Sequence, residues 1–213
     1  MFVSDSHRLL YLAPPKTGST TVGHVLRQAP FYGYQQALGT QHNTIWDDRY
    51  RDYYIFLSVR HPYTRAVSFW RYGCKRALEH DCGWRDAFRQ WFNAGLPNVA
   101  GFFRIPDLAD TLRGMWRCSW HCEQVPRPID KLVRFERFAA DLAEIESVNL
   151  RTLPHLNPGV PSNRPWHSFL ESSAEAVELI QEFWAEDFDR FGYTRDLEAC
   201  IRGEFFVEGS GLL

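Results

Sequence analysis

The stretch "LLYLAPPKTGSTTVGHVL", residues 9–26, decides how this chain folds. Its first four residues are apolar, which is typical of a strand buried on both faces of a parallel sheet. Two prolines end the strand, and the hydroxyl residues that follow Gly18 are typical helix caps. Val22, Val25 and Leu26 then share one helical face. The stretch therefore predicts a strand, a tight turn and a helix in immediate succession.

The same succession returns further along the chain. Buried strands are predicted at residues 53–59 and 130–136, and helices at 63–77, 84–95, 138–148 and 174–193. Strands that alternate with helices indicate an α/β fold with a parallel sheet. We expect a single domain over residues 1–213, because a chain of 213 residues can bury one sizeable core.

Composition and charge narrow the function classes. The chain is 45% hydrophobic and 23% charged, which excludes a disordered protein. Its net charge of −2 provides no general basic field for nucleic acid, so any anion site must be local. No apolar run is long enough to span a membrane, and the N-terminus lacks a basic segment followed by a long apolar stretch. We therefore expect a cytoplasmic protein with no membrane span.

The turn after the first strand has the composition of a phosphate cradle. The amides at a helix start have no partners within the helix, and the helix dipole favours negative charge there. Gly18 allows close approach of a ligand, and Lys16 adds a positive charge. The turn nevertheless departs from the nucleoside-triphosphatase pattern G-x-x-x-x-G-K-[ST], because Lys16 precedes the glycine and no upstream glycine is present.

A second polar motif, "LSVRHPYTRAVSFW", covers residues 57–70, where the second buried strand ends and a helix begins. Ligands of open parallel sheets bind at the carboxyl ends of the strands, so Arg60 should lie at the same sheet edge as Lys16. Ser68 follows eight residues after Arg60, on the helix. An arginine fork with a hydroxyl suits a second, monoester phosphate. We interpret Arg65 as a helix packing or surface residue.

Together, "PKTGSTT" and "RHPYTRAVS" resemble the 5′-phosphosulfate loop and the 3′-phosphate motif of the sulfotransferases that use 3′-phosphoadenosine 5′-phosphosulfate (PAPS). "KLVRFERFAADLAEI", "LPHLNPG" and "FWAEDFDRFGY" resemble later segments of the family, so the resemblance covers about residues 8–194. It is strongest to the branch that includes carbohydrate sulfotransferases and their bacterial relatives. The resemblance implies a P-loop-type three-layer α/β fold, with a central parallel sheet flanked by helices.

The resemblance also implies a role for each motif residue. Lys16 would neutralise charge on the leaving phosphate oxygen, and Ser68 would restrain this lysine while it helps Arg60 to hold the 3′-phosphate. The phosphosulfate would be held by Lys16, Thr17, Gly18, Ser19, Thr20 and Thr21. PAPS would be the co-substrate and 3′-phosphoadenosine 5′-phosphate (PAP) the product, which places the reaction in class EC 2.8.2. No metal is implied, because backbone donors and Lys16 supply the positive charge.

The acceptor hydroxyl needs a base, for which His42 in "TQHNTIWDD" is our first choice. A histidine ordinarily titrates at a pKa of about 6.5, which suits it to take a proton near neutral pH. The rival candidates are Asp47, Asp48 and His61, and weaker ones are His121 and His155. Arg164 is a further candidate for a clamp on the 3′-phosphate or the loop beside the adenine.

Several alternatives stay open at this stage. The acceptor is a glycan, a tyrosine, a lipid-linked sugar or a small natural product, and a partner protein is a further candidate to complete its site. Two other function classes compete with sulfuryl transfer. One is a small P-loop kinase that uses ATP and magnesium, and the other is a non-catalytic relative that binds a nucleotide or a glycan.

Overall fold

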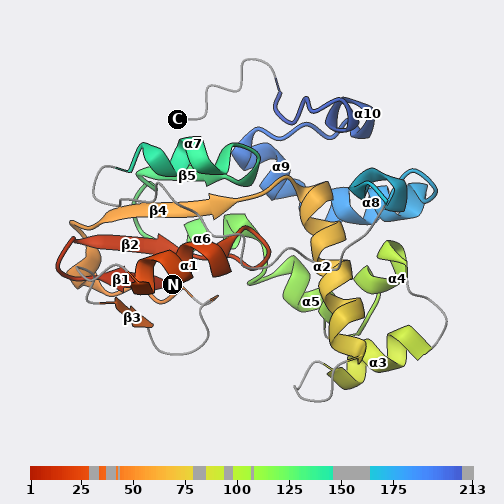
Figure 1. Cartoon of the computed structure of the whole chain (residues 1–213), viewed down its shortest axis with the longest axis horizontal. Coiled ribbons are helices and arrows are strands. Elements are labelled where there is room, and N and C mark those ends of the chain that lie inside the picture. Colours follow the sequence, from red (N-terminus) through yellow and green to blue (C-terminus); the bar gives the residue numbers. More distant parts are fainter. Residues whose placement is uncertain are drawn as a thin grey trace. The chain divides into compact units, whose positions relative to one another are not determined.

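The computed structural model describes residues 1–28, 34–36, 42, 44–78, 85–93, 98–106, 108–145 and 164–207. They form two compact units (Figure 1). Unit 1 comprises residues 1–60 and 115–157 with the last three residues, and unit 2 comprises residues 61–114 and 158–210.

Unit 1 is built around a five-stranded sheet in the order β3-β1-β2-β4-β5. Its elements are β1 (Phe2–Ser4), β2 (Leu9–Leu12), α1 (Ser19–Gln28), β3 (Tyr34–Gln36), η1 (Asp48–Tyr50), β4 (Tyr54–Val59), α6 (Cys118–Glu123), β5 (Lys131–Arg134), η2 (Phe135–Arg137) and α7 (Phe138–Ala143). The strands β2, β4 and β5 are parallel, whereas β1 pairs antiparallel with both β2 and β3. The predicted α/β class, with a central parallel sheet and flanking helices, is thereby confirmed.

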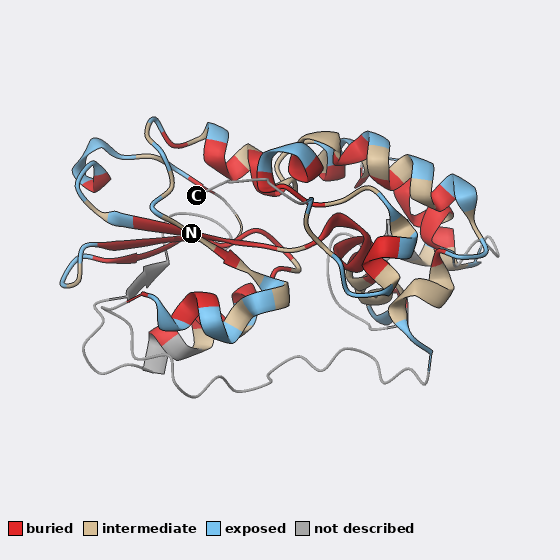
Figure 2. Ribbon diagram, turned by 90° about the horizontal axis from the view of Figure 1, so that it is seen from above, coloured by how far each residue is buried: buried red, intermediate tan, exposed pale blue. Residues whose placement is uncertain are grey.

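A hydrophobic cluster of unit 1 lies on one face of this sheet. Figure 2 shows β1, β2 and most of β4 as buried. The ring of Tyr11 stacks between Phe2 and Phe56 on neighbouring strands. Val22 of α1 and Leu142 of α7 pack into the same cluster, so both helices cover this face. The helix α1 follows β2 through the turn at residues 13–18, and α7 follows β5 through η2.

Unit 2 is helical. Its elements are α2 (Pro62–Leu78), α3 (Arg85–Asn93), α4 (Val99–Phe103), α5 (Leu108–Arg113), η3 (Trp166–Phe169), α8 (Ala174–Phe183), α9 (Ala185–Phe191) and α10 (Leu197–Ile201). The single helix predicted over residues 174–193 is wrong in one respect, because it is interrupted at Trp184. The backbone there leaves the helical region (φ −123°, ψ 31°) while the buried indole Nε1 donates to the Leu112 carbonyl at 2.9 Å. Tertiary packing of one side chain therefore divides the helix.

Candidate anion-binding and active site

The turn between β2 and α1 has an unusual backbone. Lys16 (φ 68°) and Gly18 (φ 86°) both adopt the left-handed conformation. Glycine adopts it readily, but for a lysine it costs of order 1–3 kcal/mol and needs support from its surroundings. The amides of Thr21 and Val22 donate to the Gly18 carbonyl, at 3.0 and 3.2 Å, and so start the helix. The predicted strand, turn and helix are confirmed here.

The hydroxyl side chains of the turn differ in their exposure. Thr20 is exposed and Thr21 is half-buried, whereas Ser19 and Thr17 are buried. The Thr17 hydroxyl lies 2.7 Å from the Pro14 carbonyl and 2.6 Å from the Ser58 hydroxyl. These two contacts hold the Thr17 hydroxyl inside the protein.

Arg60 lies at the same edge of the sheet as the turn. It directly follows β4, whose Leu57 is paired in parallel register with Leu12 of β2. Its Nη1 donates to the Lys16 carbonyl at 3.4 Å, a long hydrogen bond. The structure thus brings together the two cationic residues that the sequence assigned to separate motifs.

Two aromatic residues that sequence reasoning missed complete this edge. The Arg60 guanidinium lies 4.1 Å from the centre of the Phe135 ring, a cation–π contact. Phe135 is 38% exposed and directly follows β5. Phe138 at the start of α7 lies so close to Gly18 that an added Cβ would fall 2.7 Å from its Cζ. The segment "VRFERF" stands where the third predicted strand ends, as the other two motifs stand at the ends of theirs. That position could have identified Phe135 and Phe138 as site residues.

His42 lies beside the same turn. Its Nδ1 is 2.7 Å from the Ala13 carbonyl, and its side chain is half-buried. A carbonyl oxygen can only accept, so Nδ1 carries the proton of the neutral ring and Nε2 carries the lone pair. His42 therefore has the tautomer that allows Nε2 to take a proton, and its partner Ala13 lies three residues before Lys16 in the sequence.

The two carboxylates that competed with His42 have structural partners on the surface. Asp47 caps η1 by accepting from the Arg49 amide at 3.0 Å, and it also forms an ion pair with the Arg49 guanidinium. Asp48 accepts from the Trp46 indole at 3.2 Å and lies 3.9 Å from Arg51. Both side chains are exposed, so these surface contacts account for their positions.

The rival histidines are buried. His121 on α6 is inaccessible to solvent and lies 2.7 Å from the Thr44 hydroxyl. His61 is equally buried in unit 2, where its Nδ1 accepts from the Tyr63 amide and its Nε2 lies 3.1 Å from the Thr194 carbonyl. These contacts give His61 a role in starting α2. His155 lies outside the described residues.

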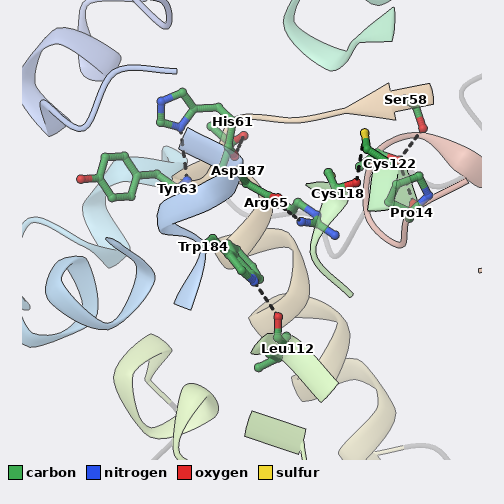
Figure 3. Close-up of polar contacts among 12 residues, drawn as sticks. Pro14, Ser58, His61, Tyr63, Arg65, Leu112, Cys118, Cys122, Trp184 and Asp187 are labelled. Atoms are coloured by element: carbon green, nitrogen blue, oxygen red, sulfur yellow. Dashed lines mark hydrogen bonds and ion pairs between the residues drawn. The ribbon is translucent and has the colours of Figure 1, made fainter. Parts of the chain in front are cut away.

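The remaining predicted site residues belong to unit 2. Ser68 is half-buried on α2, and Arg164 is exposed, with its carbonyl accepting from the Arg71 guanidinium at 3.3 Å. The surface position considered for Arg65 is wrong, because Arg65 is fully buried. It forms an ion pair with Asp187 of α9 at 3.0 Å (Figure 3). Arg65 therefore serves the packing of unit 2.

The described residues contain neither a candidate metal site nor a candidate membrane-spanning helix. No group of three or more histidine, cysteine, aspartate or glutamate residues within them is arranged to hold a metal ion. Among the helices of the same residues, none has the length and apolar character that crossing a membrane requires.

Residues 1–194 match the model of a protein family that is described as the sulfotransferase family. No curated protein and no solved structure matches the chain. The family match covers both motifs and most of each unit.

Proposed function

Since this chain belongs to the sulfotransferase family, we propose that it transfers a sulfuryl group from PAPS to the hydroxyl of an acceptor. The observation that carries the proposal is the approach of Arg60 to the Lys16 turn at the carboxyl edge of the parallel strands. A donor with two separate phosphate groups needs two cationic positions at one sheet edge, and these two residues supply them.

The residues of the turn fit the phosphosulfate end of such a donor. Gly18, in its left-handed conformation, adjoins the start of α1, where amide hydrogens favour an anion. We assign the anion to the amides of residues 17–20, with the hydroxyl groups of the exposed Thr20 and the half-buried Thr21 as further donors. PAPS supplies the sulfuryl group, and Lys16 supplies the charge that stabilises the leaving phosphate oxygen.

His42 is the proposed base. Its Nε2 would take the proton of the acceptor hydroxyl as the acceptor oxygen bonds to sulfur and the bond from sulfur to the phosphate oxygen breaks. The hydrogen bond from Nδ1 to the Ala13 carbonyl supports this role, because it holds the ring in one tautomer beside the turn and stabilises the imidazolium that forms. Positioning and charge stabilisation then supply most of the rate, as in phosphoryl transfer.

The 3′-phosphate is assigned to Arg60. The contributions of Ser68 and Arg164 stay predictions from the sequence motif. For the acceptor we favour a glycan, on the resemblance of the motifs to carbohydrate sulfotransferases; a tyrosine and a small molecule are the alternatives.

Ligand-dependent stability tests the donor assignment. PAP should raise the melting temperature, because a ligand at 100 times its dissociation constant adds about 2.7 kcal/mol to the free energy of unfolding. ATP with magnesium should have a smaller effect, since it lacks the 3′-phosphate. A larger shift with ATP and magnesium would favour a kinase, and no shift with millimolar PAP would overturn the donor assignment. A label transferred from PAPS to an acceptor would exclude the non-catalytic alternative.

The Arg60→Ala variant tests the second phosphate position. Little charge develops at the 3′-phosphate during transfer, so the variant should lose donor affinity more than it loses the rate of the bound complex. Arg8→Ala is the matched control. Arg8 directly precedes the amino end of β2, whereas the turn follows its carboxyl end, and the ion pair of Arg8 with Asp52 is exposed. Unchanged donor affinity in Arg60→Ala would overturn the assignment.

A further inference from the structure

Three buried hydroxyl groups form a continuous chain beneath the turn. The Tyr11 hydroxyl lies 2.7 Å from that of Ser58, which lies 2.6 Å from that of Thr17, which in turn lies 2.7 Å from the Pro14 carbonyl. None of these three residues is more than 1% exposed. Figure 3 shows Ser58 and Pro14 at this position. The chain joins β2 and β4 to both ends of the Lys16 turn.

Every proton in the chain can be assigned. The Pro14 carbonyl can only accept, so the single proton of Thr17 points to it. Ser58 must therefore donate to Thr17, and Tyr11 must donate to Ser58. Burial raises the pKa of Tyr11 far above its ordinary value, which keeps its hydroxyl protonated and able to donate. The hydrogen bonds thus run in one direction, from Tyr11 to the turn.

The two ends of this chain enclose the strained residue. Pro14 and Thr17 flank Pro15 and Lys16, and Lys16 is the residue held at φ 68°. A lysine keeps such a conformation only where surrounding contacts impose it. The hydrogen bond from Thr17 to Pro14 closes the turn, and Ser58 ties Thr17 to the central strand β4.

We propose that Ser58 and Tyr11 are positioning residues, which act through Thr17 to hold Lys16 in its left-handed conformation at the sheet edge. This inference rests on the proposed function, in which Lys16 stabilises charge that develops during transfer. Neither residue touches the donor. Their hydroxyl groups set where the ammonium of Lys16 lies when the transfer occurs.

The test uses Ser58→Ala, Tyr11→Phe and the double variant Tyr11→Phe/Ser58→Ala. Ser58→Ala should slow single-turnover transfer about tenfold or more, with PAP affinity reduced less than the rate, because Lys16 acts mainly in the transition state. Hydrogen exchange in peptides that cover residues 13–22 should become faster without any ligand. Tyr50→Phe, which removes the hydroxyl of another buried tyrosine in unit 1, should leave both measurements unchanged.

The double variant separates positioning from stability. In Ser58→Ala the buried Tyr11 hydroxyl loses the acceptor that it has in the chain, whereas the double variant removes both partners and should regain stability. The transfer rate should stay as low as in Ser58→Ala, because the turn is still released. A rate that recovers with stability, or unchanged exchange in residues 13–22 of Ser58→Ala, would overturn the positioning role. If the wild-type protein fails to bind PAP, the proposed function is refuted instead. The hydrogen-exchange result would then still test whether Ser58 holds the turn in place.

Discussion

Gly18 and Phe138 are packed so closely that no side chain fits between them. A Cβ at position 18 would lie 2.7 Å from Cζ and 3.0 Å from Cε2 of the ring, and the glycine is also in the left-handed conformation. Phe138 is itself packed against the core cluster of unit 1. Phe138, the first residue of α7, therefore limits which residue can occupy position 18 in the turn before α1, although positions 18 and 138 are 120 residues apart in sequence.

We predict that Gly18→Ala destabilises the protein more than Gly203→Ala does. Both glycines have positive φ (86° and 88°), so alanine costs about 1 kcal/mol at each, but no atom lies within 4 Å of a Cβ at Gly203. Overpacking against Phe138 should add roughly 1–3 kcal/mol at Gly18. Urea denaturation measures both, and Phe138→Leu should restore part of the Gly18→Ala loss. Equal losses at the two sites would contradict the packing explanation.

We predict that Lys16→Ala loses turnover while it still binds PAP. Charge develops on the leaving oxygen only as the bond breaks, and the loss of one preorganised donor costs roughly 2.7–4 kcal/mol, a hundred- to thousand-fold in rate. Lys16→Arg should recover little, because a planar fork does not replace a compact ammonium. Single-turnover kinetics with saturating PAPS measures this, with Lys75→Ala on the exposed face of α2 as control. A Lys16→Ala rate within about threefold of the wild type would refute the role.

We predict a strong loss of stability in Asp187→Ala. The Arg65 side chain is 0% exposed, so removal of its carboxylate partner leaves a buried charge, at a cost of about 3–5 kcal/mol. The double variant Arg65→Met/Asp187→Leu should recover most of that loss, because no charge remains buried. Glu182→Ala, which breaks the exposed pair with Arg113, serves as control and should change the midpoint of unfolding little. A small change in the free energy of unfolding of Asp187→Ala would show that the Arg65–Asp187 ion pair does not stabilise the packing of α2 against α9.

We predict that the transfer rate rises as pH rises through the pKa of the base. Only the neutral ring of His42 can accept a proton at Nε2, so protonation at acidic pH should suppress the wild-type rate. His42→Asn should be slower and should lack this acidic limb. Single-turnover rates between pH 5 and 8 measure both, at donor concentrations that saturate each variant. An acidic limb that persists in His42→Asn would assign the base to another residue.

The fold class was predictable because its evidence is local. Each of the strands β2 and β4 forms one short stretch of sequence with the turn residues that follow it. Parallel strands then necessarily bring their carboxyl ends to one edge of the sheet. The short strands β1 and β3 were not predicted, since three residues show no periodicity. The break at Trp184 was missed because its cause is a hydrogen bond to Leu112, 72 residues away.

By itself, the sequence determined that Lys16 and Arg60 follow two buried strands, and hence that they share a sheet edge. Only the tertiary structure decided what surrounds them. Three contacts join segments that are distant in the sequence. They are the ion pair of the buried Arg65 with Asp187, the approach of Phe138 to Gly18 and the hydrogen bond from His42 to Ala13. The physical reason is that hydrophobic periodicity records which face of an element is buried. The partner of a buried polar group is instead chosen by geometry that forms only when the elements pack.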